Sequence, residues 1–151
     1  MNIRPATKED ATTIGQIAEA TDLFPASLLD DMIAGYLNQT SKDIWLVGEV
    51  DSKVVAFIFC EPERMTDGTW NMLAIGVLPD LQGRGHGASM TAHLERDLKK
   101  SGQRILIVET MGTPELAMTR AFYRKNGYAE EGRIREFYEP GADKVIYWKA
   151  L

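Results

Sequence analysis

A run of small residues between an apolar segment and an amphipathic one constrains the fold of this chain most. Met72–Leu78 is almost continuously apolar and is followed by Pro79, which predicts a strand that ends there. Three glycines follow, at positions 83, 85 and 87. From Ala88 to Lys100, apolar residues recur at three- and four-residue spacing, which predicts a helix that ends at Gly102. The stretch therefore predicts a strand, a tight turn and an amphipathic helix in succession.

This succession predicts a binding site for an anion. The first turn of a helix leaves backbone N–H groups without acceptors, and the helix dipole adds partial positive charge there. Glycines remove the Cβ atoms that would keep a phosphate away from these donors. We therefore expect the amides of Gly83 to Ala88 to bind a pyrophosphate, with the side chains of Arg84 and His86 as supplements. A plain glycine-rich turn is the alternative.

Two ligand-binding motifs fit the same residues. Gly83, Gly85 and Ala88 match the dinucleotide fingerprint G-x-G-x-x-G/A, and Glu109 ends the next apolar run, where a ribose-binding acid would stand. This reading predicts a nucleotide-dependent oxidoreductase. Gln82, Gly85 and Gly87 instead match Q/R-x-x-G-x-G/A, a signature of the GNAT superfamily of acyl-CoA-dependent N-acetyltransferases.

The order of predicted elements favours the second motif. The pattern predicts strands at 1–5, 44–50, 53–61, 72–78, 104–108, 128–138 and 144–148, and helices at 7–21, 26–37, 88–100 and 113–125. A dinucleotide-binding domain normally begins with its phosphate-binding unit and repeats it, whereas this unit occurs once and in mid-chain. The order resembles the GNAT fold, and Arg120–Tyr128 resembles the family's F-Y-x-x-x-G-F/Y signature. We expect one α/β domain over residues 1–151, with a mixed, mostly antiparallel sheet of about seven strands, one parallel crossover and about four flanking helices.

The resemblance implies that acetyl-CoA binds along the fourth strand and the glycine turn. The residues carried over are Ile75, Gly76 and Val77 for the pantetheine arm, and Gln82, Gly83, Arg84, Gly85, His86, Gly87 and Ala88 for the pyrophosphate. Pantetheine carries two amides, so it can hydrogen-bond to a strand edge as a peptide does. Gly76 is a candidate for a β-bulge that opens the gap between the fourth and fifth strands.

Three residues are candidates for proton transfer. Tyr123 matches the family tyrosine that commonly protonates the departing CoA thiolate, and a core aromatic is the alternative. An alkylamine has a pKa of ~10.4, so presenting it neutral at pH 7 costs roughly 4.6 kcal/mol, and a base or a water chain must accept its proton. Glu109 is the best candidate for that base, with a structural hydrogen-bond acceptor as the alternative, and Glu61 is a weaker one.

The acceptor side of the site is predicted less specifically. The GNAT family often has a pantetheine-binding asparagine after the fifth strand, but this chain has Glu109-Thr110-Met111-Gly112-Thr113 there, so we expect that loop to serve the acceptor instead. Trp70, Asn71 and Tyr138 are candidates for lining the acceptor site, with purely structural roles as the alternative.

Composition excludes several other classes of function. A net charge of −5 argues against a nucleic-acid surface and is compatible with cationic substrates. No apolar run approaches the roughly 20 residues of a membrane helix. Cys60, the one cysteine, suits a reducing cytoplasm and is expected to be buried. His86 and His93 have no partners at metal-ligand spacing, so we predict no metal.

The sequence thus predicts a cytoplasmic N-acetyltransferase that moves the acetyl group of acetyl-CoA directly to a primary amine of a small molecule or peptide. An acyl-CoA-binding module without transferase activity is the alternative. The identity of the acceptor and the oligomeric state stay open, and the terminal strands are candidates for pairing in a homodimer.

Overall fold

The computed structural model describes residues 1–151, and its elements follow the predicted order. They are β1 (Asn2–Pro5), α1 (Ala11–Ala20), α2 (Leu29–Leu37), β2 (Ile44–Val50), β3 (Lys53–Pro62), β4 (Thr69–Val77), α3 (His86–Lys100), β5 (Ile105–Met111), α4 (Ala117–Lys125), β6 (Ala129–Glu139) and β7 (Ala142–Ala150). Short 3-10 turns precede α1, α2 and α4, and another lies between β4 and α3. None of the helices combines the length and the apolar character that crossing a bilayer requires.

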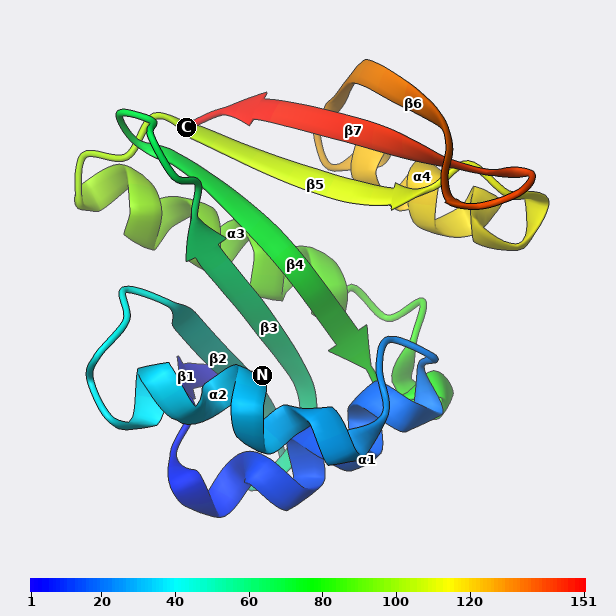
Figure 1. Ribbon diagram of the computed structural model, residues 1–151. Helices are drawn as coiled ribbons and strands as arrows, with labels where there is room; N and C mark the ends of the chain where they lie inside the picture. Colours follow the sequence, from blue (N-terminus) through cyan, green and yellow to red (C-terminus); the bar gives the residue numbers. More distant parts are fainter.

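The strands form one seven-stranded sheet in the order β1-β2-β3-β4-β5-β7-β6 (Figure 1). All neighbouring strands are antiparallel except β4 and β5, which are parallel and joined through α3. This is the mixed sheet with a single parallel crossover that the sequence predicts.

The parallel pair is short, and beyond it the sheet divides. β4 and β5 pair only over Thr69–Asn71 and Ile105–Ile107. After that, β4 remains paired with β3 as far as Val77, while β5 remains paired with β7 as far as Met111. The two strands therefore diverge toward their carboxyl ends (Figure 1), and the edge of β4 that faces β5 has no strand beside it.

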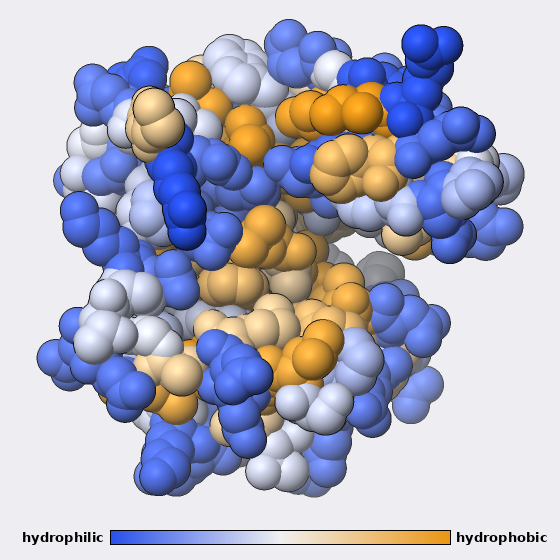
Figure 2. Space-filling model, in the orientation of Figure 1, coloured by the Kyte–Doolittle hydropathy of each residue, from blue (hydrophilic) through white to orange (hydrophobic).

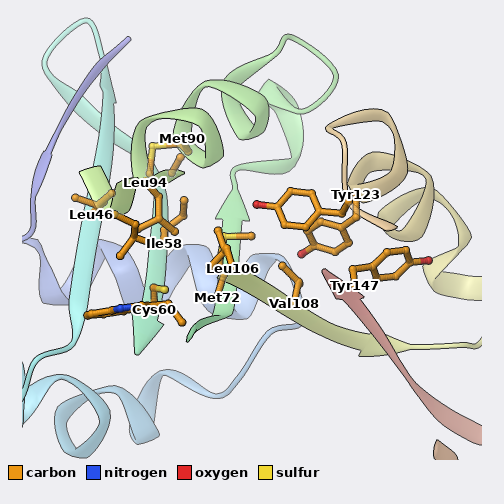
Figure 3. Close-up of a cluster of buried hydrophobic side chains, with 14 of the residues drawn as sticks. Leu46, Ile58, Cys60, Met72, Met90, Leu94, Leu106, Val108, Tyr123 and Tyr147 are labelled. Carbon is orange, nitrogen blue, oxygen red and sulfur yellow. The ribbon is translucent and has the colours of Figure 1, made fainter. Parts of the chain in front are cut away.

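Different helices cover the two faces of the sheet. α1 and α2 bury eleven residues against β2, β3 and β4, where the Trp45 and Phe59 rings stack with centroids 4.3 Å apart. α3 and α4 bury a cluster of 17 residues on the other face (Figure 3). Each large apolar side chain buried in this way contributes about 1.5–3 kcal/mol, so the two clusters hold the divided sheet in place.

The β-bulge in β4 is at Leu73, and the prediction that Gly76 marks it is wrong. The register of β3 and β4 shifts by one residue opposite Leu73. As a result, Met72 belongs to the cluster under α3 and α4, whereas Ala74, two residues later, belongs to the cluster under α1 and α2. The extra residue thus reverses the alternation of β4 just beyond the point where β5 leaves it.

Gly76 is required for close packing instead. A Cβ atom at this position would lie 2.9 Å from Cε1 of Phe57, 3.1 Å from Cγ2 of Ile17 and 3.2 Å from Cδ1 of Leu23. Two of these atoms belong to α1 and the segment after it, so the missing side chain lets α1 approach β4. Gly76 is therefore a contact residue of the core.

We expect Gly76→Ala to lower the free energy of unfolding by about 1–3 kcal/mol, because the added methyl group overpacks this contact. Gly132→Ala in β6 is the matched control, since its Cβ would meet only Cδ1 of Ile146, at 3.7 Å. The control should change stability by no more than about 0.5 kcal/mol. Urea unfolding measures both, and equal effects would contradict the packing role of Gly76.

Candidate active site

A series of free backbone amides lies at the start of α3. The six N–H groups from Gly83 to Ala88 have no acceptor within the protein. The preceding amide, of Gln82, donates to the Pro79 carbonyl at 3.2 Å, and the following one, of Ser89, donates to the Gly85 carbonyl at 3.0 Å. Six consecutive donors at the N-terminus of a 15-residue helix are arranged to bind an anion.

The three glycines of this turn have two different roles. Gly83 and Gly85 have φ values of 76° and 84°, which other residues adopt only with strain, and a Cβ at either would point into open space. Gly87 is helical, and a Cβ there would lie 3.3 Å from the Phe122 ring of α4. The first two therefore shape the turn and leave its amides accessible, while the third allows α4 to pack close to the start of α3.

The other residues predicted for the pyrophosphate lie around the same turn. The Gln82 side chain donates from Nε2 to the Val77 carbonyl at 3.0 Å, so it fastens the turn to the end of β4. Arg84 is exposed and His86 is half-buried. The Arg84 and His86 side chains thus belong to residues of the amide series itself, whereas the side-chain amide of Gln82 is already bonded to Val77.

The residues predicted for the pantetheine arm lie on the part of β4 that has left β5. Ile75 is half-buried, and Gly76 and Val77 are buried. All three follow Asn71, the last residue of β4 paired with β5. The structure therefore brings the predicted pantetheine segment and the predicted pyrophosphate segment to one end of the divided sheet.

Tyr123 of α4 has its ring in the core beneath the same region. Its side chain belongs to a residue only 5% exposed, with ring centroids 5.4 Å from Phe122, 5.8 Å from Tyr128 and 5.6 Å from Tyr147 (Figure 3). Burial raises the pKa of Tyr123 well above that of a free phenol. The ring thus has the packing role that was the alternative to an acid.

The hydroxyl group of Tyr123 is nevertheless unused. No protein group hydrogen-bonds to it, and it is not among the polar side-chain atoms that are buried without a partner. The oxygen therefore keeps some contact with solvent. Because its pKa is raised, the phenol stays protonated at all ordinary pH values and is available as a hydrogen-bond donor.

Glu109 lies within β5, two residues before its end, and both of its carboxylate oxygens have a donor. Oε1 accepts a hydrogen bond from Nδ2 of Asn71 at 3.2 Å. Oε2 forms an ion pair with Nζ of Lys144 at 2.5 Å. The Lys144 ammonium also lies 4.2 Å from the centroid of the Phe137 ring, and Nδ2 of Asn71 also donates to Oε1 of Glu63, at 2.9 Å.

Sequence reasoning missed Lys144, Glu63 and Phe137. Lys144 reaches Glu109 through the pairing of β5 with β7. Phe137 of β6 contacts Lys144, and Glu63, just after β3, contacts Asn71 of β4. No local motif marks these contacts. The alternation of residues along β5 and β7 points Lys144 and Glu109 to the same face of the sheet, and this is the one sequence signal for their contact.

Tyr123 and Glu109 lie on opposite faces of the sheet. Successive residues of a strand point to opposite faces, and Val108 packs in the cluster that contains Tyr123. Glu109 therefore points to the face that α3 and α4 do not cover. A group inserted between β4 and β5 would have the tyrosine on one side and the carboxylate on the other.

The three residues predicted for the acceptor site lie in different environments. Trp70 packs under α3 and donates its indole N–H to Oε1 of Gln103 at 2.9 Å, so its acceptor-side placement is wrong. Asn71, only 3% exposed, contacts Glu109 as described. Tyr138 is exposed, and its pKa is raised by partial burial and by the charge of Glu109. The pKa of Glu61, the weaker base candidate, is raised by burial, Asp43 and Glu63.

A cavity of about 640 Å³ opens next to Met111 of β5. Met111 follows Glu109 by two residues, so the two side chains point to the same face of the sheet. The walls of the cavity come from Asp22 after α1, the segment Thr113–Leu116 and the segment Glu139–Ala142. It contains three carboxylates and no lysine or arginine, which favours a cationic occupant. Figure 2 shows the molecule hollowed between the two halves of the sheet, with apolar residues along the hollow.

The loop after β5, which lines this cavity, is hydrogen-bonded to α4. Nη1 of Arg120 donates to the carbonyls of Met111 and Thr113, at 2.8 and 2.7 Å.

No group of three or more His, Cys, Asp or Glu side chains is arranged to hold a metal ion. The chemical groups described around the divided strands are therefore backbone amides, carboxylates, phenols and a few basic side chains.

The chain is similar to known acetyltransferases over most of its length. Residues 41–130 match the model of the GNAT acetyltransferase domain. An uncharacterized N-acetyltransferase of Methanocaldococcus jannaschii is 24% identical over 152 residues, which cover 99% of this chain and 91% of that protein.

Two solved structures share the fold. One, from Desulfovibrio desulfuricans and assigned to the GNAT family of acetyltransferases, is 26% identical with a TM-score of 0.91, covering 99% of this chain and 98% of that one. Another, from Salmonella typhimurium and containing acetyl-CoA as its cofactor, is 19% identical with a TM-score of 0.80, covering 99% and 93%. The match over residues 41–130 takes in the divided strands, the glycine turn and α4. On this evidence, the chain belongs to the GNAT family of acetyltransferases.

Proposed function

We propose that this protein transfers the acetyl group of acetyl-CoA directly to a primary amine of a small molecule or peptide. The observation that carries the proposal is the series of six free amides, Gly83 to Ala88, at the start of the helix that follows a strand separated from its neighbour. A diphosphate bound there would lie beside the end of β4. The pantetheine arm would then follow the open edge from Val77 to Ile75, toward the point where the strands part.

Glu109 is the group that would take the proton of the acceptor. An alkylammonium must lose a proton before its nitrogen can attack, and at pH 7 this costs roughly 4.6 kcal/mol for a pKa of ~10.4. Glu109 lies on the face of the sheet opposite Tyr123, which we assign to the acceptor, close to the point where β4 and β5 separate, and it would receive that proton directly or through water. The nitrogen then forms the amide bond as the carbon–sulfur bond of the thioester breaks.

Tyr123 would stabilise the sulfur as it leaves. Even for an ordinary phenol and thiol, full proton transfer to the thiolate is uphill by about 2 kcal/mol, and burial of Tyr123 raises its pKa and makes this transfer harder. The hydroxyl therefore acts mainly as a hydrogen-bond donor to the sulfur while the bond breaks, with the proton following from the phenol or from solvent.

Direct transfer is favoured over a covalent intermediate on the enzyme. The one cysteine, Cys60, is fully buried, and burial raises its pKa, so it remains a thiol without access to substrate. The acidic cavity beside Met111 supports a cationic amine as acceptor.

The function itself is tested by measuring thiol release from acetyl-CoA with a panel of amines: an alkylamine, an amino acid, an aminoglycoside, a peptide with a free N-terminus and a lysine-containing peptide. Transfer to at least one amine, with one acetyl group gained by mass spectrometry, is expected. Binding of acetyl-CoA without thiol release for any amine would instead indicate a binding module.

We expect Arg84→Glu to weaken acetyl-CoA binding about tenfold, because it places a negative charge beside the amide series. Arg64→Glu, at an exposed position in the hairpin after β3, is the matched control and should bind acetyl-CoA like the wild type. Titration calorimetry measures both affinities, and the difference should shrink at high salt. Equal affinities at low salt would place the diphosphate elsewhere.

We expect Tyr123→Phe to lower kcat about 10- to 100-fold while the KM for acetyl-CoA stays within about twofold, because the lost hydrogen bond acts on the departing sulfur. Tyr128→Phe is the control, since its hydroxyl lies in the same cluster but donates to Oε1 of Glu95 at 2.7 Å. In the wild type, ionisation of Tyr123 should cause no loss of activity between pH 7 and about pH 10, because its pKa is raised. An unchanged kcat in Tyr123→Phe would leave this residue with a packing role alone.

A further inference from the structure

A chain of side-chain contacts crosses the divided sheet at the point where β4 and β5 part. The backbone ladder between these strands ends with Asn71 opposite Ile107. The Asn71 amide then reaches Oε1 of Glu109, two residues farther along β5, at 3.2 Å. Lys144 of β7 holds the other oxygen, Oε2, at 2.5 Å. This hydrogen bond and ion pair join β4, β5 and β7 on the face that would receive the acceptor.

The environment of Asn71 is unfavourable for stability alone. Its amide nitrogen donates to Glu63 and Glu109, and its Oδ1 is buried without any donor. An unmatched buried acceptor costs about 1–3 kcal/mol, and an apolar residue of similar shape would avoid that cost. Turning the amide over would place its oxygen against two carboxylates, so its orientation is fixed. What this asparagine provides is a directed hydrogen bond to Glu109.

Lys144 acts on Glu109 from the opposite side. Its side chain is 13% exposed, and its ammonium is held between the carboxylate and the Phe137 ring. The lysine is therefore fixed by two contacts from two strands. With a donor on each oxygen, the carboxylate of Glu109 cannot rotate freely, as an isolated glutamate would.

We propose that Asn71 and Lys144 are positioning residues for Glu109, which together fix its carboxylate where the acceptor amine must lose its proton. The proposal rests on the acetyl transfer proposed above. Fixed orientation of a proton acceptor contributes to catalysis because small displacements of a reacting group reduce the rate steeply. Neither residue needs to touch the substrate for this role.

The test is Lys144→Met, which keeps a long apolar side chain and removes the charge. We expect kcat to fall about 10- to 100-fold, with the KM for acetyl-CoA within about twofold, because the carboxylate of Glu109 loses the donor that holds it in place. Lys144→Arg should restore most of kcat. Thermal unfolding and acetyl-CoA binding, measured on each variant, show that it is folded.

Lys149→Met is the matched control. Lys149 lies on the same strand and also forms an ion pair, with Oε2 of Glu95 of α3 at 2.8 Å, so its partner lies on the other face of the sheet. This variant should keep the wild-type kcat, whatever its stability. Equal losses of kcat in Lys144→Met and Lys149→Met would overturn the proposal.

A double-mutant cycle with Glu109→Gln decides whether Lys144 acts through Glu109. We expect Lys144→Met to cause no further loss of kcat once Glu109 is glutamine, since the group that it positions no longer accepts a proton. Additive losses, or a normal kcat in Lys144→Met, would overturn the positioning role while leaving acetyl transfer intact. If the wild type acetylates no amine at all, the proposed function fails and this inference fails with it.

Discussion

β4 and β5 separate after three paired positions, and the positions of the other candidate site residues depend on this separation. It exposes the edge of β4 as far as Val77, and after one short 3-10 turn the series of free amides begins at Gly83. It also separates the two faces of the sheet, with Tyr123 beneath one and Glu109 on the other. The helices stabilise this arrangement, because clusters of 17 and eleven buried residues hold the two faces.

The order of elements and the glycine turn with its free amides could be predicted because both depend on local patterns. The glycine turn, the apolar run before it and the helix after it lie within one short stretch, and their chemistry follows from backbone geometry. Residue patterns also placed the remaining elements, whose order resembles the GNAT fold, and the match over residues 41–130 confirms that family.

The contacts around the candidate base could not be predicted, because they depend on strand register. Glu109 meets Lys144 only through the pairing of β5 with β7, and it meets Asn71 only where β4 and β5 separate. The misplacement of Trp70 has a simple cause, since it precedes Asn71 directly and adjacent residues of a strand point to opposite faces. A glycine in a strand often marks a bulge, so the sequence favours Gly76 for that role, whereas in the structure this glycine accommodates Phe57 and α1.

The open edge of β4 has an energetic consequence for ligand binding. A protein that closed this sheet at rest would have to break backbone hydrogen bonds before another molecule could enter. In this fold the separation is completed when the chain folds, and the large side-chain clusters offset its cost at that stage. An incoming arm that carries amides would therefore displace only water from the edge of β4, and no strand–strand hydrogen bond would have to break. Its binding energy would remain available for orienting the reacting bond.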